Sequence, residues 1–127
     1  TKQISEWVKA PMAYRIEYLD GLKSTMLLMN GLVGDFTFAA SLKDQAEPLS
    51  TLFYLPPNPN VSYSAALMSN AEEMFITGKA PYPVERTLLT SGILAACLGS
   101  LGNGQKRIET PHLKVSYQPG KSTFWRE

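Results

Sequence analysis

The stretch Tyr14-Arg15-Ile16-Glu17-Tyr18-Leu19-Asp20-Gly21 decides the fold class. Every second residue at its start is aromatic or aliphatic and the residues between are charged, the period of two expected of a half-buried strand. Asp20-Gly21 is typical of a type I′ hairpin turn, in which both central residues take positive φ values. Residues 13–19 and 22–29 therefore predict an antiparallel hairpin.

Two further strands are predicted downstream. Asn30-Gly31 repeats the turn chemistry, and residues 35–42 place Phe36 and Phe38 on one side of a third strand. Residues 50–55 offer a fourth strand, which a proline-rich connection ends. The expected product is a meander of about four strands.

Two consecutive helices are predicted after the prolines. Apolar residues recur at helical spacing between residues 63 and 75, and Gly78 suits the left-handed position after a helix. A second helix begins near Pro83 and is apolar over so much of its circumference that it should lie between two surfaces. Gly92 and Gly99 would let one of them approach closely.

The order of these elements predicts the fold class. Residues 113–117 have the composition of a last strand that returns to the sheet. Strands followed by helices indicate an α+β fold: a mostly antiparallel open sheet, the meander plus a C-terminal strand, with two helices packed on one face. We expect one domain over residues 1–118, with room for a hydrophobic core, and a tail at 119–127.

One face of such a sheet lacks helical cover. The strands carry more large rings than one layer of helices can bury, and an exposed aromatic patch marks an interface. We therefore predict a homo-oligomer that associates through the open sheet face, with Phe36, Phe38 and Tyr54 as candidate contacts.

Composition restricts the partners. The chain has 127 residues, 44% of them hydrophobic, 18% charged, and a formal net charge of +1. Cationic residues are dispersed, which argues against nucleic acid. Uninterrupted apolar runs are short, so no membrane partner is expected.

The cysteine and histidine counts exclude several kinds of site. Cys97 has no partner for an internal disulfide, and with His112 alone it cannot form a zinc site. A cytoplasmic location is favoured over a secreted one. The chain opens within a polar helix end over residues 5–10, from which we expect a truncated N-terminus.

A family resemblance rests mainly on residues 74–94, Met-Phe-Ile-Thr-Gly-Lys-Ala-Pro-Tyr-Pro-Val-Glu-Arg-Thr-Leu-Leu-Thr-Ser-Gly-Ile-Leu. This passage resembles the end of the C-terminal domain of the glucose-fructose oxidoreductase, inositol dehydrogenase and MocA family. Residues 108–113 resemble its closing segment and residues 14–21 a sheet hairpin of the same domain.

The resemblance implies a two-domain oxidoreductase. A missing N-terminal Rossmann domain would bind NAD(P), while this chain would shape the sugar or polyol pocket and build the oligomer. The sequence departs from the family pattern in lacking the Gly-x-Gly-x-x-Gly fingerprint, the Glu-Lys-Pro motif and the early His/Asp pair. No catalytic residue, metal ligand or cofactor contact is therefore assigned within the chain.

Three residues are candidates for contact with substrate or with the missing domain: Arg15, Arg86 and His112. His112 has only Glu109 nearby as an orienting partner, and a surface histidine is the simpler interpretation. Arg86 could bind a carboxylate or hydroxyl cluster, or anchor its helix. Arg15 belongs to a set of charges that more often form cross-strand pairs.

Two functions stay open. The first is a substrate-side and oligomerisation domain of an NAD(P)-dependent oxidoreductase, inactive alone. The alternative is a free-standing binding or assembly module without chemistry.

Overall fold

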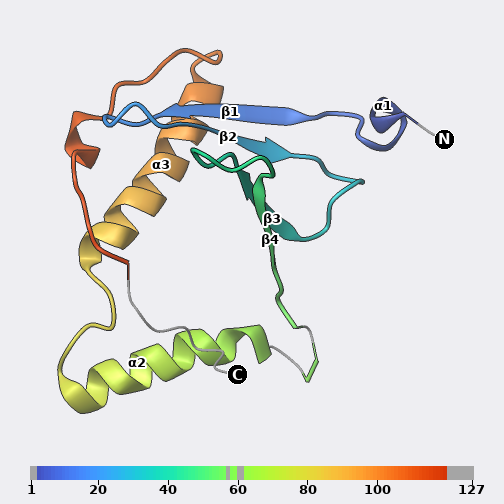
Figure 1. Ribbon diagram of the computed structural model, residues 1–127. Coiled ribbons are helices and arrows are strands. Elements are labelled where there is room, and N and C mark those ends of the chain that lie inside the picture. Colours follow the sequence, from blue (N-terminus) through green and yellow to red (C-terminus); the bar gives the residue numbers. More distant parts are fainter. Residues whose placement is uncertain (1–2, 57, 60–61, 120–127) are drawn as a thin grey trace. The chain divides into compact units, whose positions relative to one another are not determined.

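The computed structural model describes residues 3–56, 58–59 and 62–119 (Figure 1). Contacts divide the chain into two compact units, Thr1–Tyr63 and Ser64–Glu127. Helices and antiparallel strands are both present, so the predicted α+β class is confirmed. A single domain over residues 1–118 stays a prediction, and most of the predicted tail lies outside the described residues.

The first hairpin of unit 1 matches its prediction closely. Strand β1 (Met12–Glu17) pairs antiparallel with β2 (Lys23–Leu28), with Glu17 opposite Lys23. Half-buried and exposed residues alternate along β1. The face that carries the charges is therefore the exposed one, as the period of two predicts.

The turn of this hairpin differs from the predicted type I′ form. The amide of Gly21 donates to the carbonyl of Tyr18, and the amide of Tyr18 donates to the carbonyl of Leu22, at 3.1 and 2.9 Å. Gly21 has φ +90° and Asp20 is not left-handed. The loop therefore has three residues and ends in a left-handed glycine, which is a G1 bulge arrangement. The Asp20 carboxylate accepts a hydrogen bond from the Leu22 amide.

The remaining strands form a separate sheet, so the expected single meander is wrong. Strand β3 (Phe36–Ala40) pairs only with β4 (Leu49–Phe53), and no β2–β3 ladder exists within the described residues. Asn30-Gly31 does not close a hairpin. The amides of Leu32 and Val33 both donate to the carbonyl of Met29, and the chain turns away.

The N-terminal segment explains why residue 31 is a glycine. Helix α1 (Ile4–Trp7) is followed by Val8, which is only 4% exposed. Gly31 has φ +96°, and a Cβ there would lie 2.7 Å from the backbone oxygen of Trp7. Since only glycine tolerates both conditions, Gly31 serves the close approach of α1 rather than a β2–β3 turn.

Unit 2 contains the two predicted helices. Helix α2 (Ala65–Thr77) ends at Gly78, whose φ of +68° and bond to the Met74 carbonyl confirm the predicted left-handed cap. Helix α3 (Val84–Gly102) follows, with Pro83 one position before the helix rather than inside it.

The chain after α3 returns along that helix (Figure 1). A Cβ on Gly92 would overlap the side chain of Leu113, and one on Gly99 would lie 3.2 Å from Ile108 Cδ1. The predicted close approach at both glycines is therefore confirmed. The predicted strand over residues 113–117 is wrong, because Pro111–Leu113 forms a 3₁₀ turn and residues 114–119 have no regular structure.

Burial is the least predictable feature of the fold. Among the described residues, the buried apolar side chains are Val8, Cys97 and Leu113. Of α3, only Cys97 is buried, while Leu94 and Leu98 are exposed. Within the described residues, neither the expected enclosure of α3 between two surfaces nor a sizeable core is found.

Candidate functional site

The most conspicuous surface is one face of the β3–β4 hairpin. The pairs Phe36–Phe53, Phe38–Thr51 and Ala40–Leu49 lie directly opposite each other, so their side chains share a face. Phe36 is 65% exposed, Phe53 54%, Leu49 50% and Phe38 48%. We call this set, Phe36, Phe38, Leu49 and Phe53, the phenylalanine face.

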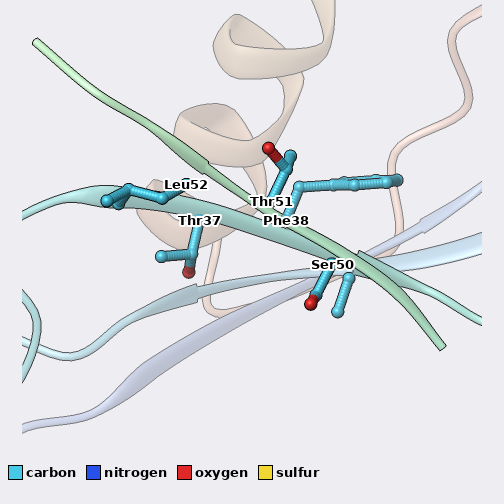
Figure 2. A pocket seen from close by; sticks show the side chains of 6 residues that line it. Thr37, Phe38, Ser50, Thr51 and Leu52 are labelled. Atoms are coloured by element: carbon cyan, nitrogen blue, oxygen red, sulfur yellow. The ribbon is translucent and has the colours of Figure 1, made fainter. Parts of the chain in front are cut away.

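The opposite side of the hairpin is smaller and more polar. Figure 2 shows Phe38 and Thr51 projecting from one side of the strands and Thr37 and Ser50 from the other. An open hollow of about 500 Å³ lies along the hairpin. The residues that line it are Thr37, Phe38, Ala39, Ser50, Thr51 and Leu52. Hydroxyl groups are their only polar side-chain atoms, so this surface can make contacts but has no acid, base or metal ligand.

The hairpin also lacks the features that usually protect a free sheet edge. Neither β3 nor β4 contains a charged residue, a proline or a glycine. Exposed edges in soluble proteins are normally guarded by charges, prolines or bulges. A two-stranded sheet is also marginally stable alone in water. Within the described residues, this hairpin is therefore an unprotected pair of strands.

The predicted contact residues are partly brought together. Phe36 and Phe38 share the face as expected, whereas Tyr54 lies one residue past the end of β4 and is exposed. Phe53 and Leu49 complete the face and were absent from the predicted set. The signal that finds them is the β3–β4 register, because cross-strand partners always share a side. Self-association itself stays a prediction.

Arg15 and Arg86 occupy different units. Arg15 is exposed on β1, opposite Thr25 and on the charged side of the first hairpin. Arg86 lies in the first turn of α3 with its guanidinium carbon 4.7 Å from the centroid of the Tyr82 ring. That stacking holds Arg86 at the helix start and leaves its donors available to an acceptor.

His112 stands apart from any acid–base pair. It lies exposed in the 3₁₀ turn, and Glu109, its only predicted partner, instead accepts from Arg107 Nε at 2.6 Å. Cys97 is buried in α3, as expected of a small core residue. Among residues 3–56, 58–59 and 62–119, no neighbour of His112 or Cys97 would activate it for catalysis.

The described residues contain no cluster of three or more His, Cys, Asp or Glu side chains able to hold a metal ion. Among them, one helix, α3, is long and apolar enough to cross a membrane by length and composition. The prediction from uninterrupted runs did not single out this helix, because polar residues and glycines interrupt its apolar runs. Core helices of water-soluble proteins can be equally long and apolar but are mostly buried, whereas Cys97 is the only buried residue of α3.

Comparison with known proteins gives no neighbour. No protein-family model matches the sequence, no curated protein is similar to it, and no solved structure is similar to its fold.

Proposed function

We propose that this chain is an interface module whose apolar faces are covered by further polypeptide. In its specific form, it is the substrate-side and oligomerisation part of an NAD(P)-dependent sugar or polyol oxidoreductase, inactive by itself. The phenylalanine face is the contact surface, and a second copy of the chain is the partner.

The observation that carries this proposal is the exposure of that face. Its three rings are each about half exposed, which leaves roughly 300 Å² of aromatic surface in water if a ring side chain offers about 200 Å². With Leu49 added, the patch falls in the size range of the largest apolar patch on a typical monomer, which is often functional. Covering about 300 Å² of it would contribute roughly 8 kcal/mol before the entropic costs of association.

The return of the chain along α3 supports protein, rather than a bilayer, as the surroundings of that helix. Within unit 2, Ile108 lies against Gly99 and Leu113 against Gly92, so the returning segment runs antiparallel to the helix. It carries Lys106, Arg107, Glu109, His112 and Lys114. If α3 crossed a membrane, these polar side chains would enter the hydrocarbon with it, at a cost of several kcal/mol.

The enzymatic part of the proposal rests on the family resemblance. In this hypothesis NAD(P) binds to a Rossmann domain outside these residues, and that domain supplies hydride transfer. Arg15, Arg86 and His112 are the candidates for contact with substrate or with that domain. Arg86 suits this role best, because Tyr82 orders its guanidinium and leaves planar donors for hydroxyl or carboxylate oxygens.

The alternative is a free-standing binding or assembly module. The exposure of the phenylalanine face supports this alternative equally, because contact through that face needs no bound nucleotide. Titration of the chain with NAD and NADP tests the cofactor assignment: we expect no saturable heat, and micromolar binding would contradict it. A dehydrogenase assay with a sugar and polyol panel, on the protein that joins this chain to a dinucleotide-binding domain, separates the two functions.

A matched pair of substitutions tests the interface. Phe38→Asp places a charge on the phenylalanine face, and Thr37→Asp places the same charge at the neighbouring position on the other side of β3. Light scattering after gel filtration, over a range of protein concentrations, should show a dimer or larger for the unaltered chain and for Thr37→Asp. Phe38→Asp should weaken association at least tenfold.

The outcomes against the proposal are definite. A monomer at every concentration for the unaltered chain rules out a second copy as the partner. Equal association of the two variants means that assembly uses another surface. Circular dichroism of both variants verifies that each keeps its secondary structure.

A further inference from the structure

We draw no further inference here: the strongest candidate, the exposed leucine stripe along α3 formed by Leu94, Leu98 and Leu101, is an unpartnered apolar helix face, and nothing in the structure shows what covers it.

Discussion

Replacing Gly92 by alanine should destabilise unit 2, although the same change in a helix normally stabilises it. Gly92 lies in the interior of α3, where alanine is favoured over glycine by about 1 kcal/mol. The added Cβ would, however, overlap Leu113 Cδ2 and lie 2.9 Å from Cδ1 and 3.2 Å from Cγ. Because Cγ is also close, rotation of the methyl groups alone does not relieve the contact.

The cost of the clash with Leu113 and the gain in helix propensity can be compared directly. Leu113 is 8% exposed, so moving it aside sacrifices most of its burial, which is worth roughly 1.5–3 kcal/mol. Overpacking in place costs a similar amount, about 1–3 kcal/mol. After the gain in helix propensity of about 1 kcal/mol is subtracted, we expect Gly92→Ala to lower the free energy of unfolding by up to about 2 kcal/mol.

A sign reversal makes the test sharp. In a Leu113→Ala background the clash is gone, so Gly92→Ala should then stabilise unit 2 by up to about 1 kcal/mol. Urea unfolding followed by circular dichroism at 222 nm measures this, since α2 and α3 are the long helices of the described chain. Gly102→Ala in the same helix, with no atom within 4 Å of its new Cβ, is the control. If Gly92→Ala stabilises both backgrounds as Gly102→Ala does, Leu113 does not lie over Gly92.

Two further predictions concern unit 1 and the environment of α3. Gly31→Ala should destabilise unit 1 by about 2–3 kcal/mol, because alanine is strained at φ +96° and its Cβ meets the Trp7 carbonyl; Gly34→Ala, in open space, should have little effect. Hydrogen exchange at the amides of Leu32 and Val33, which donate to the Met29 carbonyl, measures this loss of stability. The chain should remain unbound when centrifuged with neutral phosphatidylcholine vesicles, and stable co-flotation would contradict our proposal that protein, rather than a bilayer, surrounds α3.

Local chemistry was sufficient to predict most elements. Alternation in β1 and the left-handed glycine after α2 each depend on a few adjacent residues, and both are confirmed. The close approach at the two glycines of α3 was predicted from their missing side chains alone, without the identity of the contacting residues, Leu113 and Ile108. The position of Phe36 and Phe38 on one side of β3 was also predictable, because alternate residues of a strand lie on the same side. The residues that complete the phenylalanine face required the register with β4, which no single strand specifies.

The wrong predictions concern residues whose type fits two different local structures. Asp20-Gly21 satisfies both a two-residue and a three-residue turn, and the Asp20 side chain bond to the Leu22 amide accompanies the longer loop. Asn30-Gly31 fits a hairpin turn equally well, but the approach of Trp7 uses the glycine for packing. In residues 113–117, Leu113 is buried against α3 and the chain is turned by Pro111, so strand composition was overridden by a tertiary contact.

The contrast between the two hairpins gives the strongest physical reason for an interface. The first hairpin places its charges, Arg15, Glu17 and Lys23, on an exposed side and keeps alternate residues half-buried, so it is adapted to water. The second carries no charge and exposes three phenylalanine rings. Since both hairpins belong to one unit and one chain, general sequence composition does not account for the difference. A hairpin without charges gains stability when its rings leave water, and this supports our proposal that the phenylalanine face is a contact surface.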